Sequence, residues 1–126
     1  MARILIIDDD QEMRSLLKEF FEGEGFETHE ASNGLEGLKT LRRESFDFII
    51  TDIRMPGLTG LDILPGIRKL QPQAFIIAIT AFGSEQVNRE SLARGATAYL
   101  EKPIHFNRLK KLIHEMVSSR EKRLMG

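Results

Sequence analysis

The chain has 126 residues, 41% of them hydrophobic, and a formal net charge of −1 from 18 basic and 19 acidic side chains. This length suits one domain with a continuous core, residues 1–126, and the balanced charge gives no overall attraction to nucleic acid or to an anionic membrane. The absence of cysteine excludes disulfides, thiolate catalysis and cysteine-ligated metals, and no stretch is long and apolar enough to span a bilayer.

Short apolar runs alternate with helical patterns five times along the chain, which is typical of βαβ units around a mostly parallel sheet. The first, third and fourth runs are almost wholly apolar, as in strands covered on both faces, whereas the second and fifth are mixed and belong at the edges. The sequence therefore predicts an α/β fold with one sheet between helical layers. The predicted strands are Arg3–Asp8, Glu27–Ala31, Phe46–Asp52, Ala74–Thr80 and Thr97–Lys102.

The first two predicted helices have clear ends. The first ends near Gly23 and Gly25, since glycine is common at helix C-termini. The second, near Leu35 to Arg42, begins after Asn33, and Glu36 follows three residues later as in an N-capping arrangement. The buried face of the first helix has apolar residues at the i, i+3, i+4, i+7, i+8 spacing, namely Met13, Leu16, Leu17, Phe20 and Phe21.

The third and fourth predicted helices are less regular. The third, Leu61 to Leu70, contains Pro65 followed by Gly66. A proline inside a helix removes a hydrogen bond and clashes with the preceding turn at a cost of about 3 kcal/mol, so we expect a kink or a late start. The fourth, from Ser84 to Arg94, has few sizeable apolar residues, so we expect burial to hold it weakly. These residues are Val87, Leu92 and Ala93.

The last predicted helix repeats the apolar spacing of the first, with Leu109, Leu112, Ile113, Met116 and Val117. Its polar tail, residues 118–126, extends the helix or begins a linker. Basic residues are frequent in this part of the chain, and we interpret them as a solvated helix face rather than as a DNA contact. They are Arg108, Lys110, Lys111, Arg120, Lys122 and Arg123.

Five polar residues lie where predicted strands end. Asp8 and Asp9 close the first strand, Asp52 closes the third, Thr80 closes the fourth, and Lys102 closes the fifth. Because parallel strands all point the same way, these side chains should meet in one crevice at the carboxyl edge of the sheet, where such folds bind ligands. The sequence therefore predicts an acidic pocket with a hydroxyl and an amine on its rim.

The three carboxylates of this pocket should attract a cation. Two unit charges about 5 Å apart repel by roughly 3 kcal/mol at an effective dielectric constant of about 20. Oxygen ligands without histidine or cysteine suit a hard cation such as Mg²⁺, or Mn²⁺ in its place. We expect Asp9 and Asp52 as direct ligands, with Asp8 acting through water.

Lys102 and Thr80 extend the site toward a phosphoryl group, because an ammonium and a hydroxyl beside a Mg²⁺ site suit phosphate oxygens. A carboxylate can itself accept this group, and Asp52, central and at the end of an apolar strand, is the expected nucleophile. Aspartates after strands are also common turn formers and helix caps, which is the simpler interpretation of Asp10. Phe82 is expected at the pocket rim, where it controls access of water or a partner, or simply packs.

The residues of this pocket and their surroundings resemble the receiver domain of bacterial two-component response regulators. The resemblance extends through nearly the whole chain, in the segments RILIIDDD, DFIITDIRMPGLTGLDIL, IIAITA and AYLEKP. It implies a flavodoxin-like three-layer α/β/α sandwich whose doubly wound sheet has the strand order 2-1-3-4-5. It also implies a phosphorylation-dependent switch that catalyses only its own phosphorylation and dephosphorylation and is not otherwise an enzyme.

The resemblance assigns roles to the acidic residues by position. Asp52 resembles the phosphoacceptor, and Asp8 and Asp9 resemble the acid pair that positions Mg²⁺. The backbone carbonyl of Arg54 resembles the family's further metal ligand. Three consecutive aspartates leave the register of the acid pair open, and the position of the first helical face favours Asp8 and Asp9 over Asp10.

The resemblance also assigns the switch residues. Thr80 resembles the hydroxyl that moves toward the phosphoryl group, and Tyr99 resembles the aromatic rotamer switch. Lys102 resembles the cation that binds the phosphoryl group. The bond from Lys102 to Pro103 resembles the family's cis peptide, which is plausible because proline lowers the penalty for the cis form. Pro65 with Gly66 is not part of the family's pattern.

The implied partners are a sensor histidine kinase or histidine phosphotransfer protein, which presents phosphohistidine, and an output domain or effector protein. The output is controlled through the fourth helix, the fifth strand and the fifth helix, and the same face could join two copies in a homodimer. We expect a cytoplasmic protein whose present segment contacts neither nucleic acid nor a membrane.

Other classes of protein stay open as alternatives. An aspartyl-phosphate phosphohydrolase of the haloacid-dehalogenase type has a second aspartate two residues after the nucleophile, and here that position is Arg54. A flavodoxin-like cofactor carrier would need a glycine-rich turn, but DDDQEMR follows the first strand. A receiver used only for phosphorylation-independent docking would have lost a pocket residue, and none is missing.

The histidines lack a metal-ligand spacing and are interpreted as surface or edge residues: His29, His105 and His114.

Overall fold

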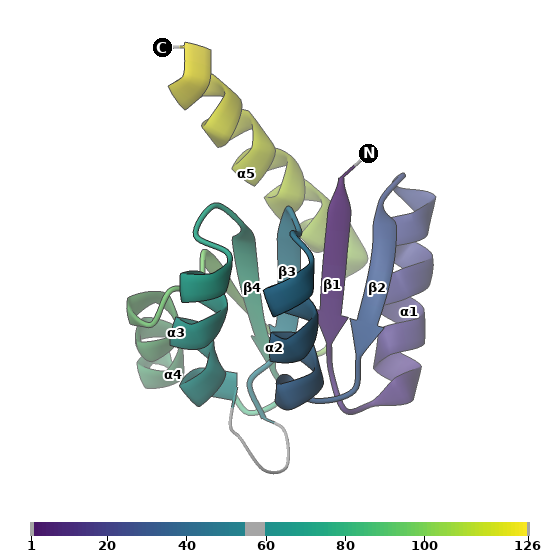
Figure 1. The fold of residues 1–126 in the computed structure, drawn as a ribbon, viewed down its shortest axis with the longest axis vertical. Helices are drawn as coiled ribbons and strands as arrows, with labels where there is room; N and C mark the ends of the chain where they lie inside the picture. The colour runs from purple at the N-terminus through teal and green to yellow at the C-terminus, as the bar shows by residue number, and fades with distance from the viewer. Residues whose placement is uncertain (1, 55–59, 126) are drawn as a thin grey trace.

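The computed structural model describes residues 2–54 and 60–125 of the chain. In this part of the chain, five strands alternate with five helices (Figure 1). The strands are β1 (Arg3–Ile7), β2 (Glu27–Ala31), β3 (Phe48–Asp52), β4 (Phe75–Thr80) and β5 (Ala98–Glu101). The helices are α1 (Gln11–Gly23), α2 (Gly34–Arg43), α3 (Gly60–Leu70), α4 (Glu85–Ala93) and α5 (Phe106–Met125).

The five strands form one parallel sheet in the order β2-β1-β3-β4-β5. Helices α1 and α5 cover one face of this sheet, and α2, α3 and α4 cover the other (Figure 1). The predicted three-layer α/β/α sandwich and its strand order are confirmed. The two strands with mixed composition, β2 and β5, are the edge strands, as their sequences predict.

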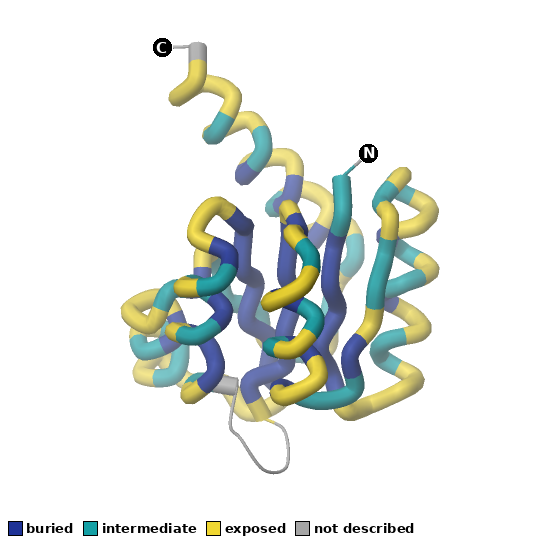
Figure 2. The backbone as a smooth tube through the Cα atoms, in the orientation of Figure 1, coloured by how far each residue is buried: buried dark blue, intermediate teal, exposed yellow. Residues whose placement is uncertain are grey.

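Alternate residues of the central strands point into two separate cores. Leu5 and Ile49 face the core under α2, α3 and α4, whereas Ile4 and Ile50 face the core under α1 and α5. Strands β3 and β4 are buried along their whole length, whereas β2 is buried only at its last residue, Ala31 (Figure 2). The carboxyl ends of the central strands are therefore held in place by packing on both faces of the sheet.

Four strands are shorter than predicted, β1, β3 and β4 at one end and β5 at both. β3 begins at Phe48 rather than Phe46, because the N–H of Phe46 donates to the side-chain oxygen of Gln71 at 3.1 Å instead of joining a neighbouring strand. β1 ends one residue before Asp8, and β5 ends one residue before Lys102. Both charged residues therefore lie in the loops that directly follow their strands.

The predicted N-cap of the second helix is confirmed. The side-chain oxygen of Asn33 accepts a hydrogen bond from the N–H of Glu36 at 2.9 Å. The carboxylate of Glu36 in turn accepts from the N–H and the hydroxyl of Ser32, at 2.9 and 2.7 Å. At α1, the side chain of Asp10 accepts from the N–H of Glu12 at 3.0 Å, so Asp10 is a helix cap as expected. These bonds fix where each helix starts.

Helix α3 runs from Gly60 to Leu70 through Pro65, so the expected late start is wrong. Pro65 has no N–H to donate to the carbonyl of Leu61, four residues before it. The structure supplies another donor, because Nη1 of Arg94, at the end of α4, lies 3.2 Å from that carbonyl oxygen. The same nitrogen lies 3.4 Å from Oδ1 of Asp62. A guanidinium from the next helix thus replaces the hydrogen bond that the proline removes.

Helix α4 is weakly buried, as its sequence predicts. Ser91 is the buried residue of this helix, and the side chain of Leu92 is 46% exposed. Ser84 caps the start of the helix, and its hydroxyl accepts from the N–H of Val87 at 3.1 Å. Few apolar contacts therefore hold α4 against the sheet.

Helix α5 projects beyond the sheet, and its far end is largely exposed (Figures 1 and 2). Residues 118–125 are its last turns. Across the described residues, none of the helices has the length and apolar character needed to cross a membrane.

Candidate functional site

The predicted carboxylates meet at the carboxyl edge of the sheet. β1 and β3 are neighbours whose register pairs Ile7 with Thr51, so the next residues, Asp8 and Asp52, lie side by side. Ligand oxygens of Asp8, Asp9 and Asp52 all lie within 4.8 Å of one another. Asp8 is fully buried and Asp52 is 4% exposed, whereas Asp9 is exposed. We call these three residues the acid cluster.

Lys102 joins the two buried members of the acid cluster. Its Nζ lies 2.7 Å from Oδ2 of Asp52 and 3.2 Å from Oδ2 of Asp8. The peptide bond from Lys102 to Pro103 is cis, as expected. The amine of Lys102 therefore lies where the sequence predicts it, at the edge of the same pocket and in contact with Asp52, the expected nucleophile.

Backbone N–H groups hold the second oxygen of each buried carboxylate. Oδ1 of Asp52 accepts from the N–H of Arg54 at 2.7 Å, and Oδ1 of Asp8 accepts from the N–H of Asp10 at 2.9 Å. Each carboxylate is thus oriented with one oxygen toward the loop that follows it and the other toward Lys102. The role of the Arg54 carbonyl as a metal ligand stays a prediction.

Burial and neighbouring charges shift the pKa values of two groups in the pocket, Asp8 and Lys102. Burial raises the pKa of the Asp8 carboxyl, and the nearby charge of Asp52 raises it further, although the bonds from Asp10 and Lys102 act in the opposite direction. Burial lowers the pKa of Lys102, but its bonds to Asp52 and Asp8 outweigh that effect, and its pKa is raised overall. The ammonium therefore stays charged, while negative charge on Asp8 is costly.

Thr80 is fully buried at the end of β4, next to the strand that ends at Asp52. Its hydroxyl oxygen accepts from the N–H of Phe82 at 3.1 Å. The ring of Phe82 is 69% exposed, and the guanidinium carbon of Arg54 lies 5.4 Å from its centroid. Phe82 and Arg54 therefore connect the loops that follow β4 and β3, beside the acid cluster.

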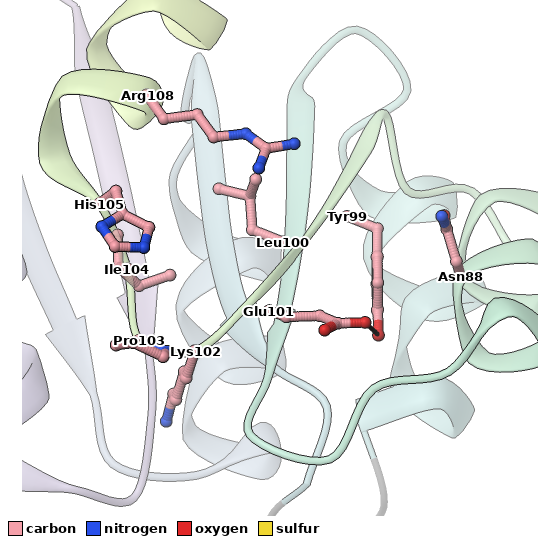
Figure 3. A pocket seen from close by; sticks show the side chains of 9 residues that line it. All are labelled: Asn88, Tyr99, Leu100, Glu101, Lys102, Pro103, Ile104, His105 and Arg108. Carbon is pink, nitrogen blue, oxygen red and sulfur yellow. Dashed lines mark hydrogen bonds between the residues drawn. The ribbon is translucent and has the colours of Figure 1, made fainter.

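Tyr99 lies on β5, among residues that line a groove between α4, β5 and α5 (Figure 3). Its hydroxyl donates to Oε1 of Glu101 at 3.3 Å, and the two side chains lie next to each other in the close-up. Burial raises the pKa of the Tyr99 phenol, and the negative charge of Glu101 raises it further. Asn88 of α4 and Arg108 of α5 line the same groove.

Comparison with known proteins identifies the family. Residues 4–114 match the response regulator receiver domain. The chain is 33% identical to sporulation initiation phosphotransferase F of Bacillus subtilis, over 86% of this chain and 87% of that protein. It is 36% identical to the response regulator protein PilR of Pseudomonas aeruginosa, over 88% of this chain but only 25% of that protein.

Among solved structures, the chain is 39% identical to the response regulator protein TrrA of Thermotoga maritima, determined in complex with Mg²⁺-BeF, with a TM-score of 0.82. The alignment covers 91% of this chain and 98% of that one. The chain belongs to the response regulator receiver domain family. Its resemblance to this family, and the two-component signalling class that follows from it, are confirmed.

The donor atoms of this receiver fit a hard divalent cation. Three carboxylates converge, two of them buried, and histidine and cysteine are absent from the cluster. Lys102 brings one positive charge to two buried carboxylates, Asp8 and Asp52. A divalent cation would balance the remaining negative charge.

One contact of the receiver has no counterpart in the sequence motifs. Nη1 of Arg14, on α1, donates to the backbone carbonyl of Asp8 at 2.7 Å, and its Nε lies 3.2 Å from Oε1 of Glu30 on β2. The one sequence signal is an arginine in the first helical turns after the aspartates. That signal does not specify the contact, because arginine is common on solvated helix faces.

Proposed function

We propose that this receiver is a phosphorylation-dependent signalling switch in which Asp52 accepts a phosphoryl group from a phosphohistidine, with Mg²⁺ bound. The observation that supports this most strongly is the contact of Asp52 with Lys102, at 2.7 Å, inside the acid cluster. The donor is a sensor histidine kinase or a histidine phosphotransfer protein.

In the proposed transfer, a carboxylate oxygen of Asp52 attacks the phosphorus in line with the scissile bond. The new P–O bond forms while the P–N bond breaks. The electron pair of the broken P–N bond stays on the imidazole nitrogen of the donor. Lys102 neutralises charge on the transferred oxygens, and the N–H of Arg54 holds the carboxylate in orientation. Positioning and charge neutralisation are what phosphoryl transfer chiefly needs.

Asp8, Asp9, Asp52 and the backbone carbonyl of Arg54 would hold Mg²⁺, or Mn²⁺ in its place. When bound, the cation neutralises negative charge on the phosphoryl oxygens and on the acid cluster. The Mg²⁺-BeF complex of the Thermotoga maritima relative supports this choice of cation. The cluster's all-oxygen donor set supports it independently.

The new phosphoryl group adds about −1.5 to −2 charges beside Thr80 and Lys102. Thr80 then turns its O–H toward the phosphoryl oxygens, and Tyr99 adjusts its rotamer in response. Helix α4 is weakly buried, so it can be displaced at small cost. The face formed by α4, β5 and α5 then acts on an output domain or effector protein, or on a second copy of the chain in a homodimer.

In this proposal the domain is cytoplasmic and catalyses only its own phosphorylation and dephosphorylation. A general phosphohydrolase is disfavoured because Arg54 stands where a second aspartate would serve as acid and base. Its side chain faces the ring of Phe82. A purely docking receiver is disfavoured because the nucleophile, the acid pair, the hydroxyl and the lysine are all present.

The test is transfer from a small phosphodonor such as acetyl phosphate in the presence of Mg²⁺, followed by intact-protein mass spectrometry. We expect one phosphoryl group per chain for the wild type, none for Asp52→Asn, and none for the wild type in excess chelator. Undiminished labelling of Asp52→Asn, or transfer without divalent cation, would contradict the proposal. Steady hydrolysis of a generic phosphoester that is lost in Asp52→Asn would favour the phosphohydrolase.

A further inference from the structure

Arg14 connects three segments of the fold beside the acid cluster. It begins on α1, its Nη1 donates to the backbone carbonyl of Asp8, and its Nε pairs with Glu30 on β2. The side chain is only 14% exposed, so the guanidinium is largely withdrawn from solvent. Lys18, one turn further along α1, also pairs with Glu30, at 3.7 Å, but does not contact Asp8.

The carbonyl that Arg14 holds belongs to the peptide unit between Asp8 and Asp9. A peptide unit is planar, so fixing its carbonyl oxygen also fixes the direction in which the chain continues to the Cα of Asp9. The carboxylate of Asp9 makes no hydrogen bond or ion pair with any described residue. Its position within the acid cluster is therefore set by its backbone.

We propose that Arg14 is a positioning residue for the cation site. Through the Asp8 carbonyl, it holds Asp9 where its carboxylate can share a divalent cation with Asp8 and Asp52. This inference rests on the proposed cation site and adds to it a residue that does not itself touch the cation. Glu30 acts one step further out, by holding the guanidinium in place.

The sign of the effect separates positioning from simple electrostatics. If Arg14 acted only as a nearby positive charge, its removal would reduce repulsion and tighten cation binding. If it positions Asp9, its removal loosens the Asp8–Asp9 peptide unit and weakens binding. Residues that orient metal ligands typically change metal affinity by about 10- to 100-fold when replaced.

The experiment measures Mn²⁺ affinity of the full 126-residue chain without phosphodonor, from the electron paramagnetic resonance signal of the free ion. Arg14→Met retains most of the aliphatic stem and removes the donors. Lys18→Met is the matched control, because it removes a positive charge from the same helix and from the same partner, Glu30. We expect about 10-fold weaker binding for Arg14→Met and unchanged or slightly tighter binding for Lys18→Met.

Urea unfolding of each variant establishes that the protein is folded at the titration temperature. If Arg14→Met does not fold, Glu30→Gln tests the same idea, because it releases the guanidinium while leaving Arg14 in place. We expect it to weaken Mn²⁺ binding by a smaller factor. Unchanged or tighter binding by folded Arg14→Met, or by Glu30→Gln in its place, would overturn the inference alone. A wild type that binds no Mn²⁺ would instead overturn the cation site of the proposed function.

Discussion

The floor of the pocket and the α4 side of the receiver are built in opposite ways. The floor lies at the ends of β1 and β3, where apolar residues on both faces hold the backbone and where Asp8 and Asp52 are buried. Helix α4 has one buried residue, Ser91, and depends on a serine cap at one end and on Arg94 at the other. Charge is thus concentrated where the fold is most tightly packed, and apolar contacts are fewest where the fold can respond.

This difference bears on how a phosphoryl group could change the shape of the domain. Inverting a two-state population from 1:99 to 99:1 requires about 5.5 kcal/mol of differential interaction. A helix with few apolar contacts lowers the cost of the alternative arrangement, so less of that energy is needed. In the proposed mechanism, the rigid floor would let the same group interact with Thr80 and Lys102 without deforming the central strands.

The largest expected effect tests the floor. Lys102→Met leaves two buried carboxylates without their cation, and removing one partner of a buried ion pair costs about 3 kcal/mol or more. We expect the free energy of unfolding of the cation-free protein to fall by about that amount in urea denaturation. The control is Lys110→Met, because Lys110 pairs with Glu24 at 3.5 Å and is 49% exposed. That variant should lose less than about 1 kcal/mol, and equal losses would remove the contrast.

A smaller effect tests the contact between α3 and α4. Arg94→Ala should cost about 1 kcal/mol, because it leaves the Leu61 carbonyl without a donor. In a Pro65→Ala background the N–H of residue 65 can bond to that carbonyl, and the cost should nearly vanish. A double-mutant cycle of unfolding free energies measures this coupling. An equal cost in both backgrounds would show that the pair with Asp62 accounts for the effect of Arg94.

The groove between α4, β5 and α5 can be probed by titrating the phenol of Tyr99. Tyr99 is the single tyrosine of a chain without tryptophan, so the ultraviolet absorbance of phenolate reports this residue alone. We expect its pKa above the usual value of about 10 and a decrease on Glu101→Gln. Since the folded pKa exceeds the unfolded one, this contribution to stability is present below the unfolded pKa and is lost as the pH rises through the folded one. A Glu101→Gln variant with an unchanged or higher pKa would contradict the assigned cause.

The smallest expected effect concerns Phe82. Its ring is mostly exposed, so Phe82→Ala should lower the unfolding free energy by no more than about 1 kcal/mol. Losing its contact with Arg54, worth about 0.5–1 kcal/mol, should loosen the two loops beside the pocket. We expect the phosphorylated protein to hydrolyse roughly threefold faster, followed as loss of the phosphorylated mass. A longer lifetime would mean that Phe82 does not restrict water.

The sequence was sufficient to predict the floor of the pocket because the residues that specify it lie close together in the chain. Apolar runs ending in Asp8, Asp52 and Thr80 specify parallel strands, and the geometry of a parallel sheet then brings those ends together. The N-cap at Asn33 was readable for the same reason, since both bonding partners lie within four residues of each other.

Two features could not be predicted in this way. Pro65 breaks a local rule, and the donor that compensates for it, Arg94, comes from a different helix, 33 residues from Leu61. Arg14 contacts a backbone carbonyl, and a backbone carbonyl leaves no mark in the sequence. In both cases the bond is long-range or backbone-directed, so residue spacing alone gives no information about it.

The most direct test of the account is the chemical location of the phosphoryl group. After reaction with acetyl phosphate and Mg²⁺, borohydride reduces an aspartyl phosphate to homoserine, and peptide mass spectrometry locates the converted residue. The account predicts homoserine at position 52 and at no other aspartate. Conversion at Asp8 or Asp9, or a protein that gains phosphate but yields no homoserine at position 52, would contradict it.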